Sequence, residues 1–205
     1  MKEVEVNKQA KLSEHLALPS EAALSHSSEL NGLHLSPHFS LGEMTKTSYH
    51  PQDGNIPSRV HIENLINLCE NWLEELRSRY NLLYGQRKVT REGQSPCNSV
   101  AELPAHRGDS PCVSQESPIV INSGFRSPEV NQKCGGATHS NHLTGCAVDI
   151  HCAGKEQAIR YACILLDIAD GKKLDFDELI LEKRGTTIWV HFAVRPKGNR
   201  RYVDF

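Results

Sequence analysis

The sequence lacks the features that would let the chain hold nucleic acid, cross a membrane or rely on disulfides. Its 23 Lys and Arg residues are outnumbered by 25 Asp and Glu, so it offers no basic excess for a phosphate backbone. Its 38% apolar residues form no run near the roughly 18 that a membrane helix requires. Its seven cysteines include no Cys-x-x-Cys pair, which predicts reduced thiols, with Cys97–Cys112 as a pairing left open. We therefore expect no nucleic-acid partner and no membrane span.

Polar residues are concentrated in two segments, and the remaining sequence is that of one domain. Residues 1–36 are rich in Ser, Glu and His and show no sustained hydrophobic period, which predicts a flexible N-terminal leader. Residues 84–117 are rich in Gly, Ser, Pro, Arg and Asn and cannot bury enough surface to offset the entropy of ordering. We therefore predict one domain over residues 37–205, with a low-complexity insertion at about 84–117.

Two amphipathic helices and a hairpin indicate an α+β domain. A helix is predicted over Ser58–Tyr80, because apolar residues recur there at helical spacing. A second helix is predicted over Lys155–Ala169, with Gly171 ending it. Residues 174–182 and 187–194 are typical of two strands joined by a glycine-containing turn.

A short segment contains the residue types of a zinc site. The sequence from Ser140 to Asp149 places an imidazole at His142 and a carboxylate at its end. Zinc binds both types of ligand, and a catalytic zinc site uses three protein ligands and leaves one position for water. His191 lies inside an apolar strand-like run, where a histidine costs free energy unless its ring is satisfied. We therefore predict that His142, Asp149 and His191 hold a zinc ion.

Two further residues are candidates for catalysis. Arg126 follows a predicted buried strand at Ile119–Ile121, at the kind of strand exit where functional side chains collect; a surface ion pair is the alternative. Glu182 lies at the end of the first hairpin strand, on a face that could approach His191 across the hairpin. A carboxylate beside a metal site can act as a general base, whereas without the metal Glu182 would be an ordinary solvated charge.

Three motifs around these candidates occur together in the chain. They are Ser140-x-His142-x-x-Gly145-x-Ala147-x-Asp149, Ser123-Gly-Phe-Arg126-Ser and Trp189-Val-His191. This combination resembles the zinc D-Ala-D-Ala carboxypeptidase family, which includes VanY- and VanX-like enzymes and phage endolysin peptidases and shares its fold with the hedgehog signalling domain. The resemblance spans about residues 37–83 and 118–197. It implies an α+β fold with a small, mainly antiparallel sheet and flanking helices.

The resemblance also implies a role for each motif residue. The implied zinc ligands are His142, Asp149 and His191. Arg126 would bind a substrate carboxylate or polarise the scissile carbonyl, and Ser140 would help to anchor the substrate. Glu182 would be the general base. VanX-like members place their glutamate three residues before the last histidine, where this chain has Ile188, so Asp177 is kept as the alternative base.

The implied function is zinc-dependent hydrolysis of a peptide bond in bacterial cell-wall peptidoglycan, by a monomeric D,D-carboxypeptidase or an endolysin-type endopeptidase. A non-catalytic, zinc-stabilised binding module of the same fold is the alternative. The N-terminus has no apolar segment of the kind found in secretory signals, so we expect a cytoplasmic protein. Release to the cell wall as a phage or prophage lysis protein would then bring it to its substrate.

Overall fold

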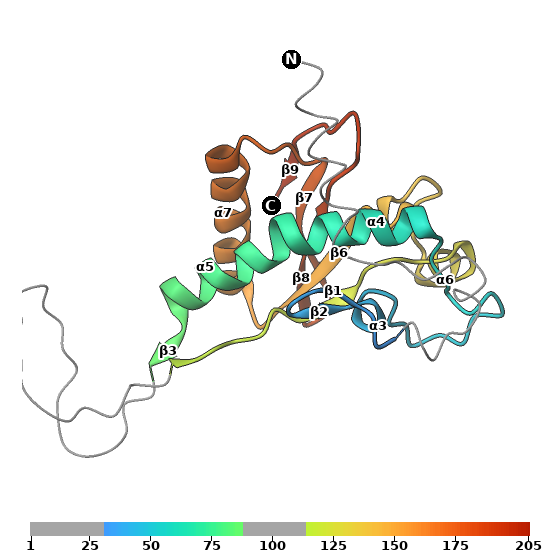
Figure 1. Cartoon of the computed structure of the whole chain (residues 1–205), viewed down its shortest axis with the longest axis horizontal. Helices are drawn as coiled ribbons and strands as arrows, with labels where there is room; N and C mark the ends of the chain where they lie inside the picture. The colour runs from blue at the N-terminus through green and yellow to red at the C-terminus, as the bar shows by residue number, and fades with distance from the viewer. Residues whose placement is uncertain (1–30, 88–113) are drawn as a thin grey trace, which may run out of the picture.

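A mixed five-stranded sheet lies at the centre of the residues described by this computed structural model, 31–87 and 114–205 (Figure 1). Its strands, in spatial order, are β5 (Ile121–Ser123), β6 (Ala147–Cys152), β8 (Thr187–Ala193), β7 (Glu178–Arg184) and β9 (Tyr202–Asp204). Neighbouring strands are antiparallel, except that β7 and β9 are parallel. The prediction of an α+β fold with a small, mainly antiparallel sheet is therefore correct only in part, because the edge strand β9 makes the sheet mixed.

Helices cover one face of this sheet. The elements concerned are α4 (Arg59–Leu68), the π-helical segment η2 (Cys69–Leu73), α5 (Glu74–Tyr84) and α7 (Lys155–Lys172). Figure 1 shows the first three as one continuous rod that passes α7. Trp72 from this rod packs against Phe192 of β8, with ring centroids 4.9 Å apart. Because strand residues alternate between faces, the two sequence neighbours of Phe192 point to the opposite face of the sheet.

Both long helices end later than the sequence predicts. The first continues beyond the predicted end at Tyr80 to Tyr84, and the second runs to Lys172. Gly171 does not end the second helix; Lys173 does, with a left-handed backbone φ of 53°. The last residues of both helices are exposed, so the hydrophobic spacing on which the prediction rests carries no signal there.

Shorter elements complete the described structure. They are β1 (His34–Ser36), β2 (Phe39–Ser40), α3 (Leu41–Met44), β3 (Gln86–Arg87), β4 (Ser114–Gln115), α6 (Pro128–Cys134) and the 3-10 helix η3 (Asn141–Thr144). The predicted leader, 1–36, lies outside the described residues except for 31–36. The strands β3 and β4 lie at the two ends of the predicted insertion and pair with each other. Residues 88–113 lie outside the described residues, and so does the possible Cys97–Cys112 pairing. No described helix is long and apolar enough to cross a membrane.

The predicted hairpin is present, with a tighter turn than expected. β7 and β8 remain paired up to Arg184 and Thr187, so only Gly185 and Thr186 form the turn. Gly185 has a φ of +61°, which glycine adopts at little cost. The strand predicted at Ile119–Ile121 is observed two residues later, as β5. Ile119 is buried, as the prediction expects, but it is not part of the strand.

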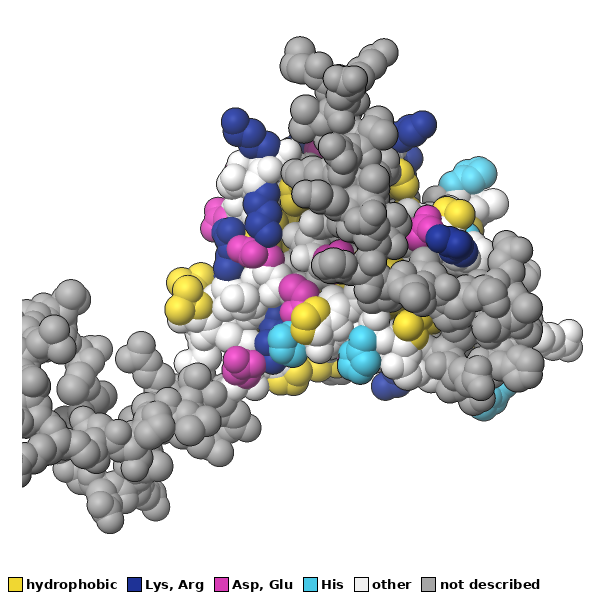
Figure 2. Space-filling view, in the orientation of Figure 1, with side chains coloured by type: hydrophobic (Ala, Val, Ile, Leu, Met, Phe, Trp, Pro, Cys, Tyr) yellow, Lys and Arg dark blue, Asp and Glu magenta, His cyan; other side chains and the backbone are white. Residues whose placement is uncertain are grey.

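Charges of both signs are interspersed over the α5 and α7 part of the surface (Figure 2). Ion pairs along and between these helices are Arg79–Glu75, Arg160–Glu156 and Lys172–Glu75. Exposed pairs of this kind contribute about 0–1 kcal/mol each. This part of the surface is therefore an ordinary solvated helix face, and the candidate site residues lie on the other side of the sheet.

Candidate metal centre

His142 is held by the short helix η3, whose two ends are set by the sequence. The Ser140 hydroxyl accepts a hydrogen bond from the backbone N–H of His142 at 3.3 Å. Gly145 ends the helix with a φ of +68°, and a Cβ added there would lie 2.5 Å from the carbonyl oxygen of His61. Ser140 and Gly145 of the predicted motif therefore shape the turn that presents His142.

The sheet register brings the other two candidate ligands together. Asp149 in β6 lies directly opposite His191 in β8. His191 Nδ1 is 2.9 Å from Asp149 Oδ1, and His142 Nε2 is 3.2 Å from the same oxygen. The three ligand atoms all lie within 4.8 Å of one another. The residues are 2%, 7% and 8% exposed for His142, Asp149 and His191, so the structure gathers the three predicted ligands in one buried cluster.

The ring nitrogens that point away from this cluster are both occupied. His142 Nδ1 lies 2.6 Å from the carbonyl oxygen of Gly124, which can only accept a hydrogen bond. His191 Nε2 lies 3.2 Å from Glu178 Oε2, a carboxylate oxygen. Each imidazole therefore carries a proton on its outer nitrogen and, when neutral, turns a lone pair towards Asp149.

Three lone pairs that converge on one point require positive charge between them. Ligand atoms around a tetrahedral zinc ion, at bond lengths near 2.0–2.1 Å, would lie about 3.3 Å apart. The distances of 2.9 and 3.2 Å to Asp149 Oδ1 are close to that spacing. In the metal-free protein, an extra proton on the His191 ring would supply positive charge. The donor set and its spacing thus fit a metal ion such as zinc.

The pKa values of Asp149 and His191 are both shifted in the direction that favours positive charge on the imidazoles next to the carboxylate. Burial opposes the ionisation of Asp149, but His142 and His191 outweigh it and hold the pKa of the carboxyl well below its usual range. Burial also opposes the charge on His191, but hydrogen bonds to Asp149 and Glu178 outweigh it and raise the pKa of the imidazole. A bound cation would replace the extra proton of His191, so we expect metal binding to release protons.

Arg126 contacts the cluster through Asp149. Its guanidinium donates hydrogen bonds to Asp149 Oδ2 and, at 2.7 Å, to Ser123 Oγ. Its backbone N–H donates to the carbonyl oxygen of His142 at 3.1 Å. Asp149 thus directs one oxygen to the imidazoles and the other to Arg126. The predicted arginine therefore provides a fixed positive charge beside the cluster.

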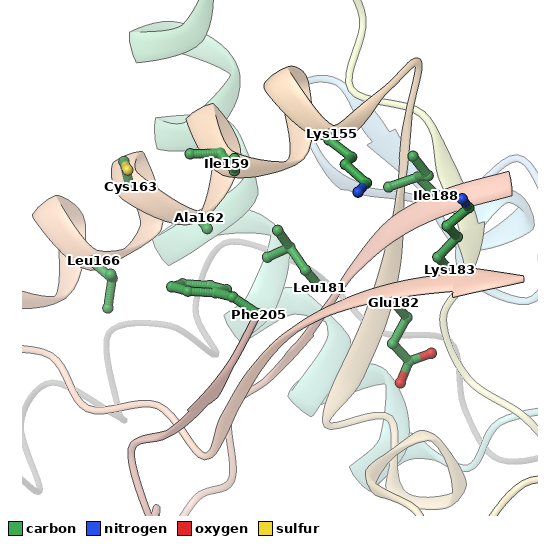
Figure 3. Close-up of a pocket in the computed structure, with 10 residues that line it drawn as sticks. All are labelled: Lys155, Ile159, Ala162, Cys163, Leu166, Leu181, Glu182, Lys183, Ile188 and Phe205. Atoms are coloured by element: carbon green, nitrogen blue, oxygen red, sulfur yellow. The ribbon is translucent and has the colours of Figure 1, made fainter. Parts of the chain in front are cut away.

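Glu182 lies on the same face of the sheet as the cluster. It is paired with Trp189 across β7 and β8, and Ile180 is paired with His191. Side chains two residues apart share a face, so Glu182 projects on the side of His191. In Figure 3 the Glu182 carboxylate points away from Leu181, which faces α7. The structure therefore puts this carboxylate on the face that the sequence predicts for it.

Asp177, the alternative base, is fully buried and both of its oxygens are occupied. Its Oδ1 accepts hydrogen bonds from Arg195 and Arg200 at 2.7 and 2.9 Å. Its Oδ2 accepts from Arg200 and Asn141 at 2.9 and 2.8 Å. Burial raises the pKa of Asp177, but these hydrogen bonds outweigh burial and lower it to about 2. A carboxylate saturated in this way is poorly placed to take a proton from water.

An apolar pocket of about 410 Å³ lies on the opposite side of the sheet from the cluster (Figure 3). Ile159 and Leu166 of α7, Leu181 of β7 and Phe205 line it. Glu182 also lines this pocket, although its carboxylate points away from Leu181 in Figure 3. His142, Asp149 and His191 do not line it, so the pocket is distinct from the cluster of candidate ligands.

Three residues at or next to the centre are not among those predicted from the sequence: Gly124, Asn141 and Glu178. Glu178 could have been found, because it shares a strand face with Glu182 in the period-2 pattern. Gly124 contributes a backbone carbonyl, which no side-chain signal marks. Asn141 donates to Asp177 at 2.8 Å and to Glu178 at 2.9 Å, contacts between distant segments that local patterns do not show.

A family model described as Peptidase M15 matches residues 113–178 of the chain. This match supports the M15 zinc peptidase family in the broad sense, and with it zinc-dependent peptidase activity. The matched range contains His142 and Asp149, whereas Glu182 and His191 follow it. No curated protein matches the chain. The family match and the His–Asp–His cluster thus point to the same class, a metal-dependent peptidase.

Proposed function

We propose that the chain is a zinc metallopeptidase that hydrolyses a peptide bond in bacterial cell-wall peptides. The proposal is carried by the convergence of His142 Nε2, Asp149 Oδ1 and His191 Nδ1, with both outer ring nitrogens held by acceptors. Outer contacts of this kind are typical of histidines that bind metal. The M15 match supports the reaction class, and the motif resemblance supports the cell-wall substrate.

Each residue around the centre has a separate role in the proposed hydrolysis. His142, Asp149 and His191 would hold the zinc ion, which would supply a Lewis acid for the scissile carbonyl and the attacking water. Glu182 accepts the proton of this water and passes it to the leaving amine. Arg126 binds an anionic group of the substrate or stabilises the negative charge that develops on the carbonyl oxygen. Ser140, which caps η3, is the candidate for anchoring the substrate.

We assign the base to Glu182 rather than Asp177 on grounds of access. A general base must come within hydrogen-bond reach of the proton that it takes. The Asp177 carboxylate is fully buried and surrounded by donors that already occupy it. Glu182 is only partly buried, and its strand position puts it on the same face as His191.

Two kinds of cell-wall peptidase fit this chemistry. A D,D-carboxypeptidase needs a positive group for the terminal carboxylate of its substrate, a role suited to Arg126. An endolysin-type endopeptidase needs access to the peptide on both sides of the scissile bond. The proposal includes a monomeric enzyme made in the cytoplasm and released to the wall by a phage or prophage lysis system. Hydrolysis of a free D-Ala-D-Ala peptide, compared with intact muropeptides, distinguishes the two substrates.

Metal content and peptide hydrolysis test the proposal together. Protein purified without added metal should contain about one zinc ion per chain, and His142→Ala should lose both zinc and hydrolysis. Glu182→Gln should keep the zinc but lose about 10²–10⁴-fold in turnover, because it removes only the proton transfer. A folded wild-type protein that binds no metal would refute the centre. A zinc-loaded protein that binds muropeptides without cleaving them would identify a zinc-stabilised binding module instead.

A further inference from the structure

Glu178 connects the candidate ligand His191 to a network of charged side chains. Its Oε2 lies 3.2 Å from His191 Nε2 and accepts a hydrogen bond from Asn141 Nδ2 at 2.9 Å. Its Oε1 accepts a hydrogen bond from the Arg200 guanidinium. The side chains of His191 and Glu178 are only 10% and 21% exposed. Glu178 therefore receives donors from three parts of the chain: β8, η3 and the segment before β9.

The carboxylate of Asp177 binds the same two donors, Asn141 and Arg200, and so keeps them in place. Asp177 is fully buried and accepts hydrogen bonds from both Arg200 and Asn141. These two residues thus bridge Asp177 and Glu178, so the Glu178 carboxylate cannot turn away without breaking charge-assisted hydrogen bonds. The backbone N–H of Arg200 also donates to Asp177 Oδ1, at 3.1 Å, which fixes the segment that carries the guanidinium.

The position of Glu178 determines which nitrogen of His191 carries hydrogen. The tautomer of a metal-binding histidine is set by the hydrogen bond that its other nitrogen makes. A carboxylate has no proton to donate, so Glu178 requires a hydrogen on His191 Nε2. Nδ1 then keeps its lone pair, 2.9 Å from Asp149 Oδ1. The Gly124 carbonyl acts in the same way on His142, but the Glu178 carboxylate adds a negative charge that favours a cation nearby.

We propose that Glu178 is a positioning residue that fixes the tautomer and ring orientation of His191 for metal binding, with Arg200 holding its carboxylate in place. This inference rests on the zinc centre of the proposed function. Glu178 is not placed to be the general base, because its two oxygens already accept hydrogen bonds from Asn141 and Arg200 and face His191. It acts on the reaction only through His191.

The substitution Glu178→Gln tests this role with almost no change in side-chain volume. Glutamine has one oxygen and one NH₂ group, so in either orientation the NH₂ meets a donor from His191 or from Arg200. We expect the zinc affinity, measured by competition with a chromophoric chelator, to fall about 10–100-fold. Glu63→Gln is the matched control: Glu63 lies on α4 in an exposed pair with Arg59, and its substitution should leave the zinc affinity unchanged.

The tautomer of His191 offers a readout that a merely structural role would not change. Long-range ¹H–¹⁵N NMR of the wild-type zinc form should show His191 protonated at Nε2. In Glu178→Gln this pattern should be lost, or joined by an Nδ1–H form in the share of chains that no longer bind zinc through Nδ1. Glu178→Asp keeps the charge on a side chain one methylene shorter, so its zinc affinity should fall between those of wild type and Glu178→Gln. This second variant carries the test if the glutamine variant does not fold.

The outcomes separate this inference from the proposed function. If the wild-type protein binds no zinc, both fail. If it binds zinc and the Glu178 variants bind zinc equally well with the tautomer unchanged, the positioning role is refuted and the zinc centre stands. If affinity and tautomer change as expected but no cell-wall peptide is cleaved, the positioning role stands and the peptidase is refuted.

Discussion

Replacing Asp177 with asparagine tests the charge network behind the candidate centre. Asp177 is fully buried, and its carboxylate accepts hydrogen bonds from Arg195 and Arg200. Burial opposes ionisation, but these contacts and that from Asn141 lower its pKa from the ordinary 3.8 to about 2. A shift of this size corresponds to about 2 kcal/mol of folding free energy. We therefore expect Asp177→Asn to lower the free energy of unfolding by about 2 kcal/mol at neutral pH.

The loss should depend on pH in one direction. Because the pKa of Asp177 is lower in the folded than in the unfolded state, its stabilisation is fully present above about pH 5 and is lost as the pH falls towards 2. At about pH 2.5 the part that depends on ionisation should be below about 1 kcal/mol. The stabilities of the wild type and the variant should therefore converge in acid.

Urea unfolding at a series of pH values, followed by circular dichroism, measures both effects. Asp175→Asn is a matched control, because Asp175 is 53% exposed and its carboxylate lies 3.7 Å from Arg201. An exposed pair of this kind contributes about 0–1 kcal/mol. If the stability difference for Asp177→Asn stayed constant from neutral to acid pH, the loss would come from packing and the electrostatic reasoning would be refuted. A loss no larger than that of the control would refute it as well.

Two further predictions concern the turn before β6 and the metal. Gly145→Ala should destabilise the fold more than Gly185→Ala: both positions have positive φ, at a cost of about 1–2 kcal/mol, but only at Gly145 does an added Cβ meet a backbone oxygen, at 2.5 Å. Equal losses in urea unfolding would contradict the close approach to His61. Zinc at about 100 times its dissociation constant should stabilise the folded chain by about 2.7 kcal/mol, and less in acid because the imidazole ligands must be deprotonated. Calorimetry over a zinc series and with a chelator checks this, and a melting temperature independent of zinc would contradict it.

The helices, the hairpin and the candidate ligands could be predicted because each has a local signal. Hydrophobic spacing marks the two long helices, and a glycine between two apolar runs marks the hairpin. His191 can be identified because a histidine inside an apolar run needs a partner for its ring. Its two partners in the cluster came from one short motif, and the strand register then places Asp149 opposite His191.

The edge strand β9 and the network around Glu178 could not be predicted, because their signals are not local. The residues of β9 are all exposed and pair in parallel with β7, so they show neither alternation nor a hairpin turn. Arg200 lies in a basic, glycine-containing segment that is typical of a solvated loop. Only the tertiary structure shows that its guanidinium is directed at Asp177 and Glu178.

The pairing of β6 with β8 makes the candidate centre sensitive to the length of the chain in β8. A one-residue slip of β8 would turn His191 into the apolar core and present Val190 or Phe192 to Asp149 instead. An insertion in the turn at Gly185 lies outside this pairing and can be absorbed by a longer loop. A fluorescent or affinity label for following metal binding therefore belongs in the hairpin turn, whereas even a single residue added within β8 would disconnect one ligand from the other two.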